Sequence, residues 1–365
     1  MTTYQDDAST TALEASRPLG DISQETARHS VNHFEAESRA DIFVAHAFEE
    51  ARVDLGEVRM NYCVVGAANR PALLLIPGQA ESWWGYEDAL PYLAEHFQAY
   101  AVDLRGQGRS TWTPGRYTLD NMGNDLVRFI DLVVRRPTIV SGLSSGGVLS
   151  AWLSAYAKPG QVRGAIWEDA PLFASEVNPA WGQSIRQGLG PLFALWSKWL
   201  GDQWTIGNWA GMQAAAATEL PAWLPAALAA MSTKRDGAGA GPPQNPSGPP
   251  QNLLEYDPEW GRAFSSGTAT AGCDHARMLA SVRVPVLFTH HFRMVDDATG
   301  TVMGAISDLQ VRHARELVTS AGQRFDYHSF PHMPHSMHSQ DPELFARTVT
   351  DWSATPPQDP AVTVR

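Results

Sequence analysis

The sequence predicts an α/β protein built on a mostly parallel, doubly wound sheet with helices on both faces. Short apolar runs that do not alternate with polar residues recur along the chain, and segments of helical length separate them. Strands of this kind are buried on both faces, which is typical of a parallel sheet between two helical layers. The predicted strands are 73–76, 99–102, 138–143, 165–167, 284–289 and 325–330, with one or two earlier strands in 53–65 around a turn at Gly56.

Amphipathic periodicity predicts the helices that connect these strands. Asp120-Asn121, before an apolar-periodic run, and Asp341-Pro342, before the last helix, are expected to cap the N-termini of two of them. The predicted helices are 83–96, 119–134, 145–158, 306–321 and 342–352.

The alternation of strands and helices is interrupted once, which predicts a domain with an inserted lobe. From 173 to 271 no strand of the parallel type is found, seven tryptophans occur, and residues 237–250 are rich in Gly and Pro. We call this segment the cap and expect it to be helical, with a loop at 237–250. The remaining predicted divisions are a flexible acidic leader at 1–40, a core formed by 41–172 and 272–354, and a C-terminal tail at 355–365.

Charge and composition exclude several classes of function. The 365-residue chain has a formal net charge of −12, and an acidic surface does not bind nucleic acid or anionic lipid through counterion release. Residues 137–157 carry no charge but contain five serines and a Gly-rich turn, so they do not read as a membrane helix. No signal-peptide pattern opens the sequence, and the two cysteines do not form a disulfide framework. A soluble, cytoplasmic protein with two inert thiols is expected.

The strongest chemical signal is Gly142-Leu143-Ser144-Ser145-Gly146, directly after a predicted strand and before a predicted helix. Gly-x-Ser-x-Gly in this setting indicates a nucleophile elbow, in which a strained turn exposes the serine. Ser144 is therefore the candidate nucleophile. The backbone N–H of Ser145, at the helix N-terminus, is expected to stabilise an oxyanion.

A serine nucleophile needs a base, and histidines concentrate after the last predicted strand. His335 lies seven residues before Pro342, a spacing suited to the base of such a sheet, and His338 is the rival. The spacing His332-x-x-His335-x-x-His338 does not predict a metal site, because Pro331 and Pro334 break the helix that would display it. Neither a metal nor a cofactor is expected.

Two positions compete for the acid that orients the base. Glu168 or Asp169 follows one predicted strand, and Asp296 or Asp297 follows the next. Either carboxylate could hold the imidazole tautomer and stabilise the imidazolium. Residue chemistry alone does not choose between them.

The remaining candidates lie in the loop after strand 73–76 and in the cap. The backbone N–H of Gln79 is expected to be the second oxyanion donor, and Gly78 beside it is expected to contact substrate. An apolar substrate would be held by aromatic side chains over the strand ends. The expected lining residues of the cap are Trp204, Trp209, Trp223 and Met231.

Taken in chain order, these landmarks resemble the α/β-hydrolase family across residues 43–354. Longer segments are similar to the bacterial zearalenone lactonases of the actinobacterial type. Those segments are Ser-Trp-Trp at 82–84, Gly-Gln-Gly-Arg-Ser-Thr-Trp-Thr-Pro at 106–114, Asp-Asn at 120–121, Asp-Leu-Val-Arg-Phe-Ile at 125–130, Glu-Asp-Ala-Pro at 168–171, Gly-Asp-Gln-Trp at 201–204, Glu-Tyr-Asp-Pro-Glu-Trp at 255–260 and Thr-His-His at 289–291.

The resemblance implies hydrolysis of the macrocyclic ester of the mycotoxin zearalenone and of related resorcylic lactones, without a cofactor. It implies a Ser-His-Glu triad, with Ser144 as nucleophile, His335 as base and Glu168 as acid. The implied partner is a small apolar lactone, and the opened product carries a carboxylic acid that tends to lose CO2. This reading amounts to mycotoxin detoxification.

Other readings of the sequence stay open. The segments 103–110 and 120–130 also resemble aminopeptidases of the proline iminopeptidase type, and another carboxylesterase activity is possible. A ligand receptor on this fold with very low turnover is a reading from a different class. The aromatic-rich cap also leads us to expect a homo-oligomer.

Overall fold

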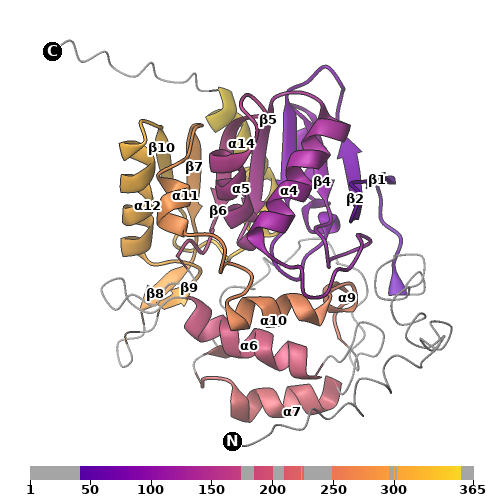
Figure 1. Cartoon of the computed structure of the whole chain (residues 1–365), viewed down its shortest axis with the longest axis vertical. Helices are drawn as coiled ribbons and strands as arrows, with labels where there is room; N and C mark the ends of the chain where they lie inside the picture. The colour runs from indigo at the N-terminus through magenta and orange to yellow at the C-terminus, as the bar shows by residue number, and fades with distance from the viewer. Residues whose placement is uncertain are drawn as a thin grey trace, which may run out of the picture.

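The computed structural model describes residues 42–173, 185–199, 209–222, 224–225, 249–295, 300 and 302–354 (Figure 1). The predicted leader at 1–40, the tail at 355–365 and most of the Gly/Pro-rich segment 237–250 lie outside these residues. Four helices of the cap and the whole central sheet lie within them.

The core is one eight-stranded sheet in the order β1-β2-β4-β3-β5-β6-β7-β10. The pairs β1–β2 and β2–β4 are antiparallel, and every other neighbouring pair is parallel, which confirms the predicted mostly parallel sheet. The strands are β1 Glu50–Asp54, β2 Arg59–Val65, β3 Ala72–Ile76, β4 Gln98–Val102, β5 Thr138–Leu143, β6 Val162–Glu168, β7 Val286–His290 and β10 Phe325–Ser329.

Helices cover both faces of this sheet because its central strands are apolar on both sides. Along β3, Leu74 and Ile76 pack into one core cluster with α4 and α5, whereas Leu73 and Leu75 pack into a second cluster with α3 and α14. In Figure 1, α4 and α5 lie in front of the sheet, and the cap helices α6, α7 and α10 lie below it. The main helices are α3 Leu90–Ala94, α4 Leu119–Phe129, α5 Ser145–Tyr156, α6 Ile185–Trp199, α7 Trp209–Glu219, α9 Gln251–Leu254, α10 Pro258–Ser266, α11 His275–Leu279, α12 Asp308–Ser320, α13 Met337–Gln340 and α14 Pro342–Ala354.

Several local predictions need correction. The segment 83–96 divides into the 3-10 helix η2 (Trp83–Tyr86) and α3, whose first turn holds Pro91. The last turn before residue 135 is the π-helix η3 (Ile130–Val134). Thr118, rather than Asp120-Asn121, caps α4, because its side chain accepts from the N–H of Asn121. A short antiparallel pair, β8 (Arg293–Val295) and β9 (Val302–Gly304), was not predicted from the sequence.

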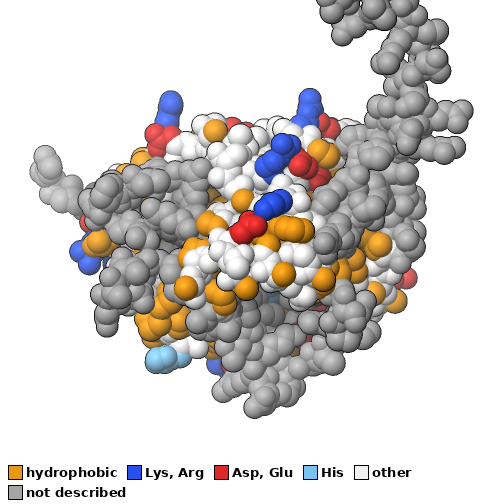
Figure 2. Space-filling view, turned by 90° about the horizontal axis from the view of Figure 1, so that it is seen from below, with side chains coloured by type: hydrophobic (Ala, Val, Ile, Leu, Met, Phe, Trp, Pro, Cys, Tyr) orange, Lys and Arg blue, Asp and Glu red, His pale blue; other side chains and the backbone are white. Residues whose placement is uncertain are grey.

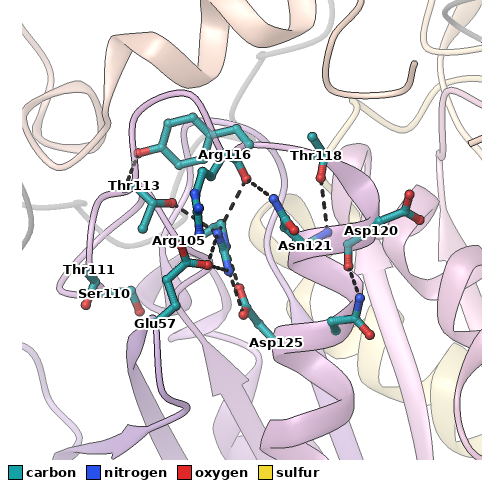
Figure 3. A network of polar contacts seen from close by, with 12 residues as sticks. Glu57, Arg105, Ser110, Thr111, Thr113, Arg116, Thr118, Asp120, Asn121 and Asp125 are labelled. Carbon is teal, nitrogen blue, oxygen red and sulfur yellow. Dashed lines mark hydrogen bonds and ion pairs between the residues drawn. The ribbon is translucent and has the colours of Figure 1, made fainter. Parts of the chain in front are cut away.

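Arg105 joins the loop after β4 to α4 through its buried guanidinium (Figure 3) and to the cap through its backbone. Arg105 donates to both carboxylate oxygens of Asp125, at 2.6 and 2.8 Å, and also contacts Glu57. Its carbonyl accepts from the indole N–H of Trp260 on α10 at 3.1 Å. The same side chain therefore holds α4 and the 105–116 loop, and its backbone holds the cap.

Hydrophobic side chains are visible on the face that carries the cap helices (Figure 2). On α7 the exposed positions include Ala210, Ala214 and Ala217, while Met212 and Ala215 are buried. The expected homo-oligomer stays a prediction. The predicted boundaries of core and cap likewise stay predictions.

The two cysteines of the chain are buried or half-buried. Cys63 is buried and Cys273 is half-buried, and both are free thiols. Burial raises the pKa of Cys63 to about 12 and that of Cys273 to about 11, so both remain protonated and unreactive near neutral pH. Within the described part of the chain, no helix is long and apolar enough to cross a membrane.

The Arg105 network predicts a large, position-specific effect on stability. Arg105→Met leaves the Asp125 carboxylate buried without its partner and should lower the free energy of unfolding by about 3–5 kcal/mol. Arg116 contacts the same Glu57 from a mostly exposed position, so Arg116→Met should cost less than about 1 kcal/mol. Urea unfolding of the two variants measures both values, and equal losses would contradict this account of the network.

Candidate active site

The candidate residues meet at one edge of the sheet because parallel strands end on the same side. Ser144 follows β5, which lies between β3 and β6 in the sheet. Gln79 follows β3, Glu168 ends β6, and His335 follows β10. The structure therefore brings the predicted nucleophile, base and oxyanion loop to the same edge.

Ser144 occupies a strained turn that its glycine neighbours make possible. Its φ is 55° and its ψ is −120°, a conformation that non-glycine residues rarely adopt. A Cβ on Gly142 would lie 2.1 Å from the carbonyl oxygen of Gly146, and one on Gly146 would lie 2.3 Å from the carbonyl oxygen of Ile76. The two glycines of the motif are therefore required by close backbone approach, as a nucleophile elbow demands.

His335 is paired with Asp169. Its Nδ1 lies 2.6 Å from Oδ2 of Asp169, whose side chain is buried, while the imidazole is 20% exposed. A carboxylate only accepts, so Nδ1 donates and Nε2 is the nitrogen left to act as a base. This arrangement has the geometry of an acid that orients a catalytic histidine.

The expected contact between His335 and Glu168 is not formed. Glu168 instead lies 3.0 Å from Nδ1 of His338, and both side chains are buried. Glu168 is the last residue of β6, and Asp169 follows it outside the strand with a φ of 43°, so the two carboxylates point in different directions. Asp169 therefore replaces Glu168 as the partner of His335, and the predicted Ser-His-Glu arrangement is corrected in this respect.

His338, the rival base, is the less suitable of the two histidines. Its side chain has no exposed surface, its ring stacks on Tyr86 with centroids 3.9 Å apart, and its Nε2 lies 3.1 Å from the hydroxyl of Ser336. Both ring nitrogens thus contact protein groups. His335 keeps one nitrogen on the accessible side of its ring.

His291 supports the Asp169–His335 pair, and the sequence analysis assigned it no such role. Its backbone N–H donates to Oδ1 of Asp169 at 3.1 Å. Its Nδ1 lies 2.7 Å from the carbonyl oxygen of His335, so Nδ1 carries the proton, and Nε2 accepts from Thr289 at 3.1 Å. The signals in the sequence were its place directly after β7 and its presence in the Thr-His-His segment at 289–291.

The electrostatics of both pairs favour their charged forms. Burial alone would lower the pKa of His335, but its hydrogen bond to Asp169 and the charge of that carboxylate raise it above the ordinary 6.5. Burial alone would raise the pKa of Asp169, but its hydrogen bond to His335 and the charge of that ring hold it below 3.8. By the same balance, the charge of Glu168 raises the pKa of His338, and the charge of His338 lowers that of Glu168.

The loop after β3 is held by the cap. The side chain of Gln79 donates to the hydroxyl of Tyr256 at 2.7 Å, and Asn252 donates to the carbonyl of Ala80 at 2.9 Å. The N–H of Gly78 donates to the carboxylate of Glu81 at 3.1 Å. Among the described residues, no hydrogen bond occupies the backbone N–H of Gln79, so it is free to serve as the expected oxyanion donor.

A cavity of about 30 Å³ lies beside Ser145. Its lining is mostly apolar, and its volume suits a small alkyl branch or one or two waters rather than a whole macrocycle. Most of its walls come from α4, α5 and α10. The lining residues are Leu119, Met122, Ser145, Val148, Pro171, Trp260, Phe264, Ala269, Thr270 and His275.

Of the four predicted cap residues, the structure describes Trp209, which does not line this cavity. Trp209 is half-buried and packs against the cluster between α6 and α7 and against the main core cluster. Trp204, Trp223 and Met231 lie outside the described residues, as do Asp296 and Asp297. Trp260 and Phe264 of α10 are aromatic residues of the cap that sequence reasoning did not single out for the site. In the described ranges, no three His, Cys, Asp or Glu side chains are grouped to hold a metal ion.

Comparison with known proteins identifies the fold. Residues 71–203 match the family described as alpha/beta hydrolase fold. The enol-lactonase of Burkholderia xenovorans LB400 superposes with a TM-score of 0.55 at 16% identity, covering 84% of this chain and 100% of that one. The chain therefore has the α/β-hydrolase fold, as its sequence predicted.

Two curated proteins are similar over shorter stretches. The 3-oxoadipate enol-lactonase 2 of Acinetobacter baylyi is 27% identical over 100 residues, which are 27% of this chain and 38% of that protein. The bifunctional epoxide hydrolase 2 of Sus scrofa is 32% identical over 124 residues, which are 33% of this chain and 22% of that protein. The chain thus matches well under half the length of either relative.

The pKa shifts predict how the His338–Glu168 pair contributes to stability across pH. Because the pKa of His338 is raised on folding, its contribution to stability is fully present below pH 6.5 and is lost as the pH rises through the folded-state pKa. The lowered pKa of Glu168 makes its contribution present above 4.5 and lost as pH falls through the folded-state value. The stability advantage of wild type over His338→Gln should therefore be greatest between 4.5 and 6.5 and shrink at alkaline pH.

Urea unfolding at pH 5, 7 and 9 measures this difference. His328 is exposed, so His328→Gln serves as the control for the same substitution outside the buried pair. An advantage over His338→Gln that stays constant or grows above pH 7 would contradict the ion pair.

Proposed function

We propose that this protein is a serine hydrolase of carboxylic esters, with Ser144 as nucleophile, His335 as base and Asp169 as the acid that orients it. The observation that carries the proposal is the 2.6 Å contact between His335 and Asp169 at the strand edge that also holds Ser144 in its strained turn. A serine exposed on a Gly-x-Ser-x-Gly turn and a histidine oriented by a carboxylate are the groups that serine hydrolases use to form a covalent intermediate.

In the first half of the reaction, Nε2 of His335 takes the proton of Ser144 as the hydroxyl attacks the ester carbonyl. Asp169 stabilises the imidazolium that forms, consistent with its effect on the pKa of His335. The backbone N–H groups of Ser145 and Gln79 stabilise the tetrahedral oxyanion, each worth about 3 kcal/mol in comparable sites. His335 then gives its proton to the leaving alcohol, and an acyl-serine remains.

In the second half, water replaces the alcohol. His335 takes a proton from water, the resulting hydroxide attacks the acyl-serine, and Ser144 leaves with the proton returned by His335. A lactone keeps its alcohol tethered to the acyl group, so water must react before the ring closes again. Loss of CO2 from the released acid would make ring opening irreversible.

We propose the resorcylic macrolactone zearalenone as substrate. The support is the set of long sequence segments, in the sheet and in the cap, that resemble zearalenone lactonases. The lactonase activity named for one relative and one structural neighbour agrees with ring-opening ester hydrolysis. The apolar cavity beside Ser145 would take only a small part of such a substrate.

Epoxide hydrolysis is the second candidate, because an epoxide hydrolase is among the similar proteins. The residue at the elbow favours esters. Attack of Ser144 on an epoxide carbon would produce an ether, which has no carbonyl for His335 and water to attack. Attack on an ester produces an acyl-serine that the same residues can hydrolyse.

The aminopeptidase reading requires carboxylates in the cap that can bind a substrate amine. Glu255 and Asp257 are buried there but already hold donors of this chain. Glu255 accepts from Ser82, Trp84 and Gln251. Asp257 accepts from Tyr117 and from the N–H of Glu259. These partners favour a role in attaching the cap over amine binding.

Chromatography of zearalenone incubated with the purified protein tests the substrate. Wild type should convert the lactone to the hydrolysed acid, and Ser144→Ala should lower the rate by at least about 10³-fold, because it removes the nucleophile. If zearalenone stays intact while the protein still reacts with a fluorophosphonate, the serine hydrolase proposal stands and the proposal of zearalenone as substrate is wrong.

The acid assignment has its own test. Asp169→Asn should leave KM for a p-nitrophenyl ester near its wild-type value and lower kcat by about 10⁴-fold, because the imidazole loses its tautomer control. Asp326, on β10, accepts a hydrogen bond from the indole N–H of Trp352 at 2.7 Å. Asp326→Asn is therefore a matched carboxylate control and should leave kcat unchanged. A loss below about tenfold in Asp169→Asn would refute the assignment.

A further inference from the structure

We infer that Glu168 is a positioning residue that fixes Ser144, the loop of His335 and the oxyanion loop relative to one another. The inference rests on the proposed function, because it assigns Glu168 a task in the same site. It also gives different roles to two adjacent carboxylates, the acid role to Asp169 and the positioning role to Glu168.

The backbone of Glu168 holds the nucleophile. Its carbonyl oxygen accepts from the N–H of Ser144 at 2.9 Å, directly after the parallel pairing of Leu143 with Glu168. This hydrogen bond lies at the strained turn itself. A displacement of the end of β6 is therefore transmitted to Ser144.

The side chain of Glu168 holds the loop that carries the base. Its Oε1 accepts from the backbone N–H groups of Met337 and His338 at 2.7 and 3.3 Å, and its Oε2 accepts from Nδ1 of His338 at 3.0 Å. Met337 lies two residues after His335. Three donors on one short segment fix its distance from the strand end more closely than one contact would.

The ring of His338 extends the connection to the oxyanion loop. It stacks on Tyr86 at 3.9 Å between centroids, and the hydroxyl of Tyr86 donates to the carbonyl of Ile76 at 2.9 Å. Ile76 is the last residue of β3, three residues before Gln79. One buried series of contacts, Glu168–His338–Tyr86, thus joins three loops from three strands.

The positioning role depends on the length of the Glu168 side chain rather than on its charge. Glu168→Asp keeps the negative charge but withdraws the carboxylate by one methylene from Met337 and His338. Glu168→Gln keeps the length and an oxygen that accepts from both N–H groups. A positioning role therefore ranks the variants in the order wild type, Gln, Asp, whereas an acid that stabilises an imidazolium ranks Asp above Gln.

The experiment measures kcat and KM for a p-nitrophenyl ester, with active sites counted by fluorophosphonate titration so that misfolded protein does not enter kcat. Glu168→Asp should lower kcat per titrated site by about 10²-fold, the cost of misplacing reacting groups by about 1 Å, with KM within about twofold. Glu168→Gln should lose less than about tenfold. Asp326→Asn, on β10, is the control for general destabilisation and should keep wild-type kcat per site.

Tyr86→Phe provides a second route if Glu168→Asp does not fold. It removes only the hydroxyl that reaches Ile76, and we expect kcat per site to fall by about three- to tenfold with unchanged KM.

Three results would overturn the inference: unchanged kcat per site in Glu168→Asp, unchanged kcat per site in Tyr86→Phe, or a larger loss in Glu168→Gln than in Glu168→Asp. A wild-type protein that neither labels with fluorophosphonate nor hydrolyses the ester would refute the proposed function, and this inference with it.

Discussion

The close approach of backbones at the β5–α5 turn is the constraint on which the rest of the site depends. Cβ atoms on Gly146 and Gly147 would lie 2.3 Å from the carbonyl of Ile76 and 2.7 Å from the Cβ of Ala170. The turn is thus in contact with the end of β3 on one side and with the segment after β6 on the other. Because no side chain fits between them, the ends of β3 and β6 lie close to this turn, and the carbonyl of Glu168 accepts from the N–H of Ser144 at 2.9 Å.

The cap is attached to the same region rather than to the sheet alone. Tyr256 holds the side chain of Gln79, and the N–H of Asp257 donates to the carbonyl of Gly106 at 2.9 Å. Trp260, which follows them on α10, lines the cavity beside Ser145. The segment that lines this cavity is therefore also the segment that holds the loop after β3, so a change in the cap reaches both places.

The sequence predicted those parts of the fold that depend on local patterns. Non-alternating apolar runs located the strands of the sheet, and the Gly-x-Ser-x-Gly motif located Ser144, because both signals lie within a few residues. The break between η2 and α3 and the N-cap residue Thr118 of α4 were not predicted. Several neighbouring residues could end or begin each helix, and tertiary contacts decide which one does. The β8–β9 hairpin has only three residues per strand and gives too little periodicity to detect.

The acid illustrates a limit that no local pattern removes. Glu168 and Asp169 are adjacent in sequence, and His335 and His338 lie three residues apart, so either pairing satisfies the chain order of a triad. The choice is made by geometry: Glu168 ends β6 on the face that packs against Met337, whereas Asp169, at φ 43°, turns toward His335 and His291. A buried carboxylate must find donors wherever its strand directs it. Asp169 consequently meets the accessible imidazole of His335, whereas Glu168 is enclosed by the loop that carries this histidine. The difference comes from the fold at the end of β6 and not from the chemistry of either residue.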